Sequence, residues 1–344
     1  MISLRSIAAG TLALSMAASA ALAQDKRVVL KLSYWVPPTH ALTPGYKEWD
    51  EALRKATNGT LSIQLFPSSQ LGSGPDHYDM VKGGVADIGL INPGYTPGRF
   101  PVIAVAELPF QTKDSHATAA ALTKWYRQYA DKEMPDVMTC HAFSHEPGTF
   151  HMTKKEVRRP EDIRGMKIRA GNATISEYIT TLGGTPIQVP IMEALETLNR
   201  GMVEGITIPW GGLVTMNFGR VAKVHTAVPL YVSVFTHNIN KKTYESLSPT
   251  QKKALDDTCT PEFAKQIYRF WGKEERDYEI KISEKPEAGR TIVKLSPEDV
   301  AAWRKSAEPV VASWKAKATK AGYNADEVYN SFVAAMREGG AAYD

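Results

Sequence analysis

Strand-like and helical segments alternate along most of this chain, and this alternation limits the possible folds more than any other feature of the sequence. Residues 28–35 (VVLKLSYW) alternate apolar and polar side chains like a half-exposed strand, and 46–57 follow as a helix. A strand, a helix and a third strand then occupy 60–67, 75–84 and 86–93. This order predicts the α/β class, in which largely parallel sheets carry helices on their faces.

The second half of the chain continues the alternation and then becomes mainly helical. Residues 191–202 have apolar side chains at helical spacing, and 203–210 (VEGITIPW) follow as a strand closed by a proline. From 241 to about 287 the sequence predicts successive helices, of which the segment 260–285 is long enough to bridge two domains. Residues 297–344 are expected to add two amphipathic helices.

The N-terminus has the pattern of a cleavable export signal. Residues 1–23 join a basic Arg5 to a short run rich in alanine and serine, and the triplet ALA at 21–23 fits a signal-peptidase site. The mature chain is therefore expected to begin at Gln24. No other stretch approaches the roughly 20 apolar residues of a membrane helix. We expect an exported protein without stable membrane insertion, and the family resemblance described below implies that its location is periplasmic.

Length and charge narrow the function classes further. About 320 residues remain after the leader, more than one core usually holds, so two domains are expected. The chain has 41 basic and 37 acidic residues, and loss of Arg5 lowers its formal charge from +4 to +3. The charges form no basic stripe, which argues against nucleic acid as a partner. Cys140 and Cys259 could form a disulfide in an oxidising compartment or remain free thiols.

An arginine at the end of a short strand-like run has the features of an anion site. Arg169 closes that run, and a helix follows with Asn172 or Thr174 as candidate caps and Glu177 completing a capping box with the threonine. A helix start presents unpaired N–H groups and the positive end of its dipole. A guanidinium can hold a carboxylate or phosphate through two parallel bonds. The corner predicts an anion clamp, and an ordinary surface arginine is the alternative.

Aromatic residues follow several of the other predicted strands. In α/β sheets, ligands bind beyond the carboxyl ends of the strands. Any one of these side chains could belong to the core. Gathered around one arginine in a shared crevice, they favour a binding pocket. They are Trp35, Tyr95, Phe150 and Trp210.

Motifs of enzymes and metal sites are largely missing. The chain has no nucleophile elbow, Walker loop, dinucleotide-binding glycine pattern or zinc-protease motif. His141, His145 and His151 would point in different directions from a strand and its loop, and Cys140 would face away from His141. We expect no catalysis, no metal and no other cofactor.

Five motifs together resemble a known receptor family. They are FPSSQLG at 66–72, VKGGVADIGLINPG at 81–94, FPVIAVAELPF at 100–110, RRPEDIRGMKIRA at 158–170 and VPIMEALETLNRGMVEG at 189–205. In these motifs the chain is similar to the solute receptors of tripartite ATP-independent periplasmic (TRAP) transporters, which include C4-dicarboxylate- and sialic-acid-binding proteins. The match runs from about Lys31 to Val333 in the family's order.

The resemblance implies a two-domain periplasmic binding protein of the α/β class. Each domain would hold a mixed, mostly parallel sheet flanked by helices, with one long helix through both. The implied boundaries are 24–147 plus about 234–272 for domain I, 148–233 plus about 273–330 for domain II, and 331–344 for the C-terminal helix end. The domains would close over a small organic acid and deliver it to a membrane permease of a small and a large subunit.

The family's substrate-binding positions can be matched one by one. The arginine that binds the substrate carboxylate corresponds to Arg169, and Asn172 matches a polar contact. Other positions are less polar than in the sialic-acid receptors, because Phe150 replaces a second arginine, Ile208 and Trp35 replace asparagines and Asn92 replaces an acidic residue. A sugar acid would leave hydroxyls unpaired there, at about 1–3 kcal/mol for each buried group. An apolar body with one carboxylate fits better.

We therefore hypothesise a receptor for a hydrophobic monocarboxylate, in particular an aromatic one such as a benzoate-, phenylacetate- or mandelate-like acid. A dicarboxylate would need a second cation, which only Arg99 or His151 could supply by turning inward. The expected substrate-binding residues are Arg169, Asn172, Trp210, Phe150, Trp35, Asn92, Tyr95, His151 and Ile208.

Four alternatives remain open from the sequence. The ligand could be a C4-dicarboxylate, or a small 2-oxo or 2-hydroxy acid held through a bound cation, although Pro209 before Trp210 counts against that metal. The receptor could instead pass its ligand to a membrane sensor. The chain could also be an exported enzyme in which Arg169 orients a carboxylate and His151 acts as general base.

Overall fold

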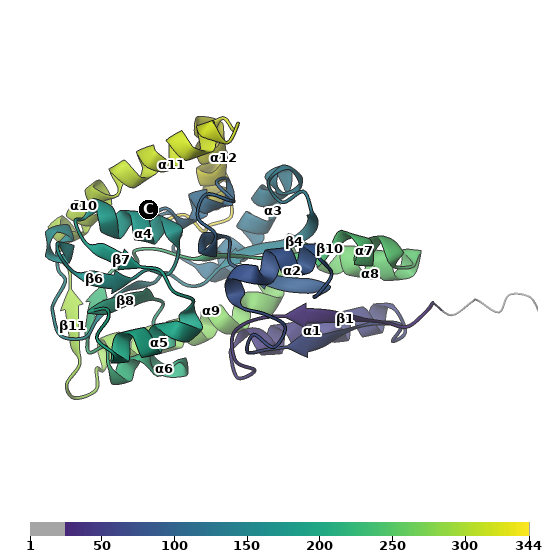
Figure 1. Cartoon of the computed structure of the whole chain (residues 1–344), viewed down its shortest axis with the longest axis horizontal. Helices are drawn as coiled ribbons and strands as arrows, with labels where there is room; N and C mark the ends of the chain where they lie inside the picture. The colour runs from purple at the N-terminus through teal and green to yellow at the C-terminus, as the bar shows by residue number, and fades with distance from the viewer. Residues whose placement is uncertain (1–24, 344) are drawn as a thin grey trace, which may run out of the picture.

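The computed structural model describes residues 25–343, which form two mixed sheets with helices packed on them (Figure 1). The α/β class predicted from the alternating pattern is confirmed. The expected export leader lies outside the described residues. Within them, no helix has both the length and the apolar character needed to cross a bilayer.

The first sheet has five strands in the order β2-β1-β3-β10-β4. Strand β1 runs parallel to β2 and β3, whereas β10 runs antiparallel to both of its neighbours. The bounds are β1 Val28–Ser33, β2 Leu61–Phe66, β3 Ile88–Ile91, β4 Val137–Ser144 and β10 Val234–Asn240. Leu30 and Leu32 of β1 are fully buried, as the alternation with Lys31 predicts.

Several helices pack on this sheet. Helix α1 contacts β2, α2 contacts β3 and α3 contacts β4. The buried Trp49 of α1 donates from Nε1 to Thr258 Oγ1 at 2.8 Å and so joins α1 to α8. The bounds are α1 Leu42–Ala56, α2 His77–Lys82, α3 Ser115–Glu133, α7 Lys241–Ser246 and α8 Pro249–Thr258.

The second sheet has six strands in the order β11-β9-β5-β8-β6-β7. All neighbouring strands are parallel except that β5 runs antiparallel to β8 and β9. Each sheet is therefore mixed and mostly parallel, with one reversed strand. The strand bounds are β5 Thr149–Met152, β6 Lys167–Arg169, β7 Thr185–Ile187, β8 Gly205–Ile208, β9 Val224–Ala227 and β11 Thr291–Lys294; the helices between them are α4 Ala173–Thr181, α5 Ile191–Asn199 and α6 Gly212–Thr215.

The long helix predicted from the sequence is α9, Pro261–Glu284, with 24 residues. It packs on α1 and α3, the helices that contact the first sheet. Farther along, its Glu275 accepts a hydrogen bond from the Gly211 N–H, and Ile282 packs in the cluster of Trp210 and Leu213. One helix therefore extends over both sheets, as Figure 1 shows.

The C-terminal region differs from the expectation of two helices. It contains α10 Pro297–Ser306, α11 Glu308–Lys320 and α12 Ala325–Glu338. The division between α10 and α11 comes at Ala307, and Gly322 has a positive φ of 83° between α11 and α12. Helix α11 packs on α4, which lies between strands of the second sheet in the sequence. Helix α12 packs on α3, which contacts the first sheet.

The chain crosses twice between the two sheets before α9 begins, after β4 and before β10. These two crossing segments lie side by side, because Gly148 N–H donates to Tyr231 O at 2.7 Å and Leu230 N–H donates to Gly148 O at 3.0 Å. A Cβ at Gly148 would lie 2.7 Å from Ile208 O and 2.8 Å from the Tyr231 ring. Only glycine allows this close approach. The predicted domain boundaries after residues 147 and 233 fall at these segments. The division into 24–147 and 148–233 stays a prediction.

The two cysteines form a disulfide, which settles the question that the sequence left open. Cys140 in β4 is bonded to Cys259, which follows α8, and the two are separated by 119 positions. The bond ties the sheet to the start of the long helix. A cross-link over so long a loop restricts the unfolded chain strongly.

Replacing both cysteines with serine should lower the free energy of unfolding by about 2–4 kcal/mol, because the unfolded chain regains the entropy of the open loop. Urea denaturation of the oxidised protein and of Cys140→Ser/Cys259→Ser would measure this difference. Added reductant should shift the midpoint of the wild type toward that of the variant and leave the variant unchanged. Equal midpoints for the oxidised wild type and the variant would contradict the prediction.

Candidate ligand-binding site

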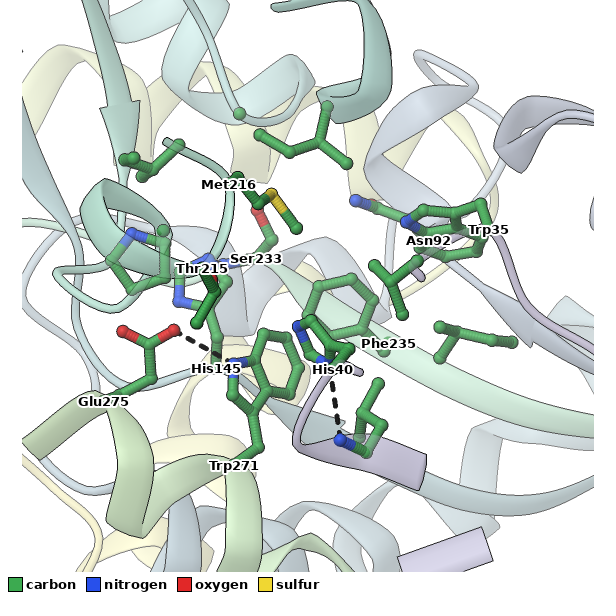
Figure 2. Close-up of a pocket in the computed structure, with 18 of the residues that line it drawn as sticks. Trp35, His40, Asn92, His145, Thr215, Met216, Ser233, Phe235, Trp271 and Glu275 are labelled. Atoms are coloured by element: carbon green, nitrogen blue, oxygen red, sulfur yellow. Dashed lines mark hydrogen bonds between the residues drawn. The ribbon is translucent and has the colours of Figure 1, made fainter. Parts of the chain in front are cut away.

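A cavity of about 70 Å³ lies where strand ends of the two sheets meet. Trp35 and Asn92 follow β1 and β3 of the first sheet, and Arg169 and Ile208 end β6 and β8 of the second. Helix α9 adds Trp271 to the lining (Figure 2). The cavity is therefore at the carboxyl edge of parallel strands, where α/β proteins bind ligands.

Arg169 carries the positive charge of this cavity. Its side chain is 2% exposed, Nε and Nη2 donate to Val189 O at 3.1 and 2.9 Å, and Nη1 donates to Thr207 O at 3.3 Å. Within residues 25–343 no carboxylate forms an ion pair with it. Carbonyl oxygens satisfy part of the guanidinium's five N–H donors but do not neutralise its charge. A buried cation without a counter-ion favours an anionic ligand.

The local sequence explains how Arg169 is placed. Helix α4 begins after Asn172, whose Oδ1 accepts a hydrogen bond from the Ile175 N–H at 2.8 Å. The alternative cap at Thr174, with a capping box to Glu177, is wrong. Thr174 lies inside the helix and donates to a buried glutamate, because the asparagine already occupies the capping position.

Aromatic rings form a continuous wall of the cavity. The centroid of Trp35 lies 5.8 Å from that of Tyr95 and 6.2 Å from that of Phe235. Phe235 in turn lies 5.4 Å from Trp271, which meets the His40 ring edge-on at 5.0 Å. These spacings fall in the range of favourable ring contacts. The wall is suited to a flat apolar body.

The two histidines of the lining are neutral and held in place. His145 donates from Nδ1 to Glu146 O at 2.6 Å, and its Nε2 accepts from the Ser233 N–H at 2.8 Å. His40 Nδ1 accepts from the Leu42 N–H at 3.2 Å. Burial lowers the pKa of each ring to about 4, so neither carries a charge near pH 7.

Asn92 presents hydrogen-bond donors at the first sheet's edge. Its Oδ1 accepts from the Gly94 N–H at 2.9 Å, which fixes the orientation of the amide. Its Nδ2 makes no hydrogen bond to the part of the chain that the structure describes. Two N–H donors are therefore available to a ligand that reaches Asn92.

Five of the nine residues expected from the sequence line this cavity. They are Trp35, Asn92, Tyr95, Arg169 and Ile208. The other four lie behind the lining.

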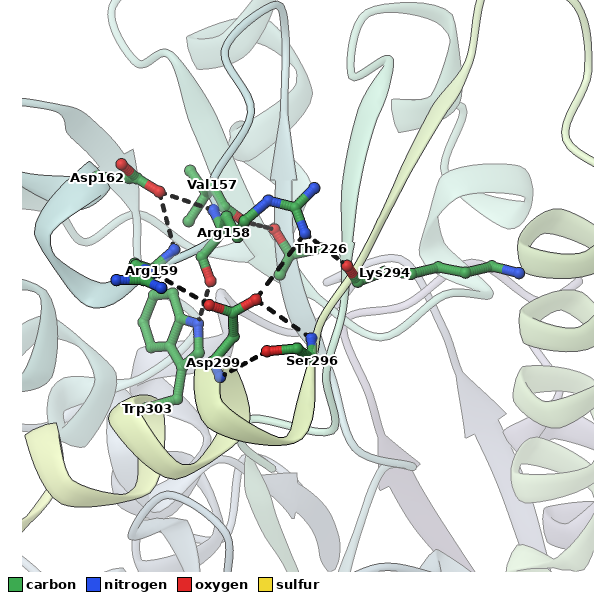
Figure 3. Close-up of polar contacts among 9 residues, drawn as sticks. All are labelled: Val157, Arg158, Arg159, Asp162, Thr226, Lys294, Ser296, Asp299 and Trp303. Carbon is green, nitrogen blue, oxygen red and sulfur yellow. Dashed lines mark hydrogen bonds and ion pairs between the residues drawn. The ribbon is translucent and has the colours of Figure 1, made fainter.

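Phe150 and His151 are drawn into the sheet by the reversed direction of β5. The edge that faces the cavity is the start of this strand, so both residues lie beyond it in the strand's interior. Phe150 packs 5.6 Å from Trp303 in the core, and Trp303 Nε1 donates to Arg158 O at 2.8 Å (Figure 3). His151 Nδ1 lies 2.9 Å from His225 Nδ1, and its Nε2 donates to Ile208 O at 3.2 Å. The expectation that they end a strand at the pocket is wrong.

Trp210 and Asn172 support the site from behind. The Trp210 ring packs on His151 and His225, with centroids 5.0 and 5.7 Å away. Asn172 donates from Nδ2 to Val232 O at 3.0 Å and to Ser233 Oγ at 3.2 Å, so its amide joins α4 to a crossing segment. Both residues are buried and neither lines the cavity.

The second cation that a dicarboxylate would need is not supplied by the two candidates. Arg99 makes a bidentate ion pair with Asp79 at 2.8 and 2.7 Å near the surface. His151 is buried in the sheet, and burial holds its pKa well below the ordinary value. Among the described lining residues, Arg169 is the only lysine or arginine.

Several lining residues in the crossing segments and the long helix were not predicted from the sequence. His145 and Phe235 flank the two crossings, and Trp271 and Glu275 are one turn apart on α9. The i, i+4 spacing of an indole and a carboxyl in the helix predicted to bridge the domains was the available signal. His40, in the loop before α1, gave no signal in the sequence.

The fold and the cavity define a solute-binding protein of the two-domain periplasmic type. Residues 32–317 match the family model of bacterial extracellular solute-binding protein, family 7, or DctP. The chain belongs to this family, which confirms the resemblance to TRAP receptors.

Solved structures and a curated relative agree with this assignment. A TRAP solute-binding protein of an unidentified marine microbe, specific for aromatic acids and solved with 3-hydroxybenzoate, is 29% identical, with a TM-score of 0.85 over 93% of this chain and 99% of that one. A benzoate-bound TRAP receptor of Rhodoferax ferrireducens is 25% identical, with a TM-score of 0.84 over 91% and 98%. The C4-dicarboxylate-binding protein DctP of Rhodobacter capsulatus is 25% identical over 314 residues, 88% of this chain and 90% of that one.

Phe235→Leu should weaken the binding of a flat apolar anion about three- to tenfold, because it removes a ring from the cavity wall. Isothermal titration would measure the affinity. Phe150→Leu is the matched control, since it makes the same change at a buried ring that packs on Trp303 instead. It should lower the melting temperature and leave the affinity unchanged. If Phe150→Leu lowered the affinity more than Phe235→Leu, the assignment of Phe235 to the cavity wall and of Phe150 to the core would be contradicted.

Proposed function

We propose that this protein is the periplasmic receptor for aromatic monocarboxylates of a TRAP-type transporter. The observation that carries the proposal is the buried guanidinium of Arg169, which pairs with no carboxylate of residues 25–343 and opens onto a cavity walled by aromatic rings. A carboxylate would neutralise the guanidinium through its remaining N–H groups. The ring of the ligand would lie against Trp35, Phe235 and Trp271.

The lining also disfavours the two other ligand classes, sugar acids and C4-dicarboxylates. A sugar acid would bring several hydroxyls into a lining that is mostly apolar, and each hydroxyl that finds no polar partner there costs about 1–3 kcal/mol. A C4-dicarboxylate would bring a second charge into a lining in which Arg169 is the one arginine or lysine among the residues that the structure describes. The structural relatives bound to benzoate and 3-hydroxybenzoate support an aromatic ligand.

The transport setting follows from the family and the sequence. Residues 1–23 would direct export, and the disulfide between Cys140 and Cys259 suits an oxidising compartment. The receptor would close around its ligand at the crossing segments and present it to a permease with a small and a large membrane subunit. We propose no catalytic role, because the family is one of solute receptors.

A ligand panel tests the proposed substrate class. Purified mature protein should bind benzoate, phenylacetate or mandelate, and should bind neither succinate nor sialic acid, because the site has one cation and apolar walls. A bound acid at 100 times its dissociation constant should stabilise the fold by about 2.7 kcal/mol, which a thermal-shift assay detects. Tight binding of succinate or lactate without any response to aromatic acids would overturn the aromatic assignment.

Substitution of the arginine tests the carboxylate clamp. Arg169→Ala should abolish measurable binding, since the ligand carboxylate would be buried without a cation, and Arg169→Lys should restore only part of the affinity because it lacks the planar fork. Arg99→Ala is the control, because it removes a guanidinium that is paired with Asp79 outside the cavity. Calorimetric affinity that is unchanged in Arg169→Ala would remove this residue from the site.

A further inference from the structure

We propose that the carboxyl group of Glu275 recognises a hydroxyl group on the ligand, so that the preferred ligand is a hydroxylated aromatic monocarboxylate. This inference rests on the proposed function and specifies it further. It assigns the two ends of one ligand to two residues, with its carboxylate at Arg169 and its hydroxyl at Glu275.

Glu275 lines the same cavity as Arg169 but forms no ion pair with it. It projects from α9, is 4% exposed, and its Oε1 accepts from Trp271 Nε1 at 3.0 Å (Figure 2). Its Oε2 accepts from the Gly211 N–H. Two donors from different elements therefore fix the carboxyl group in one orientation. Such a fixed group can discriminate between ligands, because it does not turn to accommodate the wrong one.

The hydrogen-bonding capacity of Glu275 is only partly used. Each oxygen accepts one N–H and keeps a further lone pair, and a protonated carboxyl also has an O–H to donate. Asn92 Nδ2 in the same lining, which has no partner among the described residues, offers donors only, whereas the hydroxyl groups of Thr215 and Ser233 already have partners. Thr215 Oγ1 donates to Gly211 O at 3.0 Å, and Ser233 Oγ accepts from Asn172 Nδ2 at 3.2 Å. A ligand hydroxyl, which both donates and accepts, matches the unused capacity of the carboxyl group.

The protonation state of Glu275 permits this contact next to an anionic ligand. Burial raises the pKa of Glu275 to about 8, so the group is mainly neutral at pH 7. The titratable groups near it are Glu274 on the same helix, Glu146, which pairs with Arg276, and Tyr231. The same cavity also holds Arg169 and the neutral rings of His40 and His145. The two acids favour the neutral form of Glu275 as well. A neutral acid adds no repulsion toward the ligand's carboxylate.

The first experiment compares ligands that differ by one hydroxyl. At pH 7 the wild type should bind 3-hydroxybenzoate or 4-hydroxybenzoate at least tenfold more tightly than benzoate in calorimetric titrations. Glu275→Leu should reduce this ratio to about one without abolishing benzoate binding. Glu274→Gln, a change at the neighbouring position of α9, should keep the wild-type ratio.

The second experiment uses pH and does not require the leucine variant to fold. The affinity of the wild type for benzoate, whose own charge is constant in this range, should fall by up to tenfold per pH unit above about pH 8, as Glu275 loses its proton. Glu275→Gln should give a flat profile between pH 7 and 9.5, whereas Glu274→Gln should retain the decline. A purely structural role of Glu275 would not produce this difference.

The outcomes separate this inference from the proposed function. If benzoate binds and neither hydroxybenzoate is preferred, or if Glu275→Leu keeps the preference, the role of Glu275 is overturned while the receptor for aromatic acids stands. The same conclusion follows if the wild type and Glu275→Gln have identical pH profiles. If no aromatic acid binds at all, the proposed function fails and the inference fails with it.

Discussion

The close pairing of the two crossing segments is the constraint on which the rest of the molecule depends. Gly148 and Tyr231 join these segments through backbone hydrogen bonds, and His145 bonds across them to the Ser233 N–H. A side chain at Gly148 would collide with Ile208 O and with the Tyr231 ring. Because the crossings fix where each sheet begins and ends, they bring strand ends of both sheets to one cavity. The long helix α9 also contacts this junction, because its Trp271 ring meets the His145 ring edge-on, with centroids 6.0 Å apart.

The cavity combines a permanent charge with apolar walls, and this combination gives the protein its chemistry. Burial of a cation is unfavourable, and carbonyl oxygens relieve it only in part. Val189 O and Thr207 O hold Arg169 in place while some of its N–H groups remain available. The rings of Trp35, Phe235 and Trp271 make this part of the lining apolar, and Coulomb attraction is stronger where the surroundings have a low dielectric constant. An anion with a flat apolar body would satisfy both features together.

Much of the fold and part of the site could be predicted because they depend on local sequence. The alternation in residues 28–35 gave β1, and Asn172 was a candidate cap before α4. Arg169 was identified from a strand end followed by a helix start. Phe150 and His151 were misplaced because strand direction is not encoded locally: β5 is the reversed strand of its sheet, so these residues point into it and not toward the cavity.

The sequence by itself determined the α/β class, the long helix, the position of Arg169 at a strand end before a helix, and the family, because periodicity, capping residues and motifs are properties of neighbouring residues. Only the tertiary structure decided which side chains share the cavity. Phe235, Trp271 and Glu275 come from elements far from Arg169 in the chain, and they meet it because both crossings and α9 converge there. The disulfide between Cys140 and Cys259 was decided in the same way, since its two halves are 119 positions apart. Contacts of this kind depend on the packing of whole sheets and helices, and no local pattern specifies them.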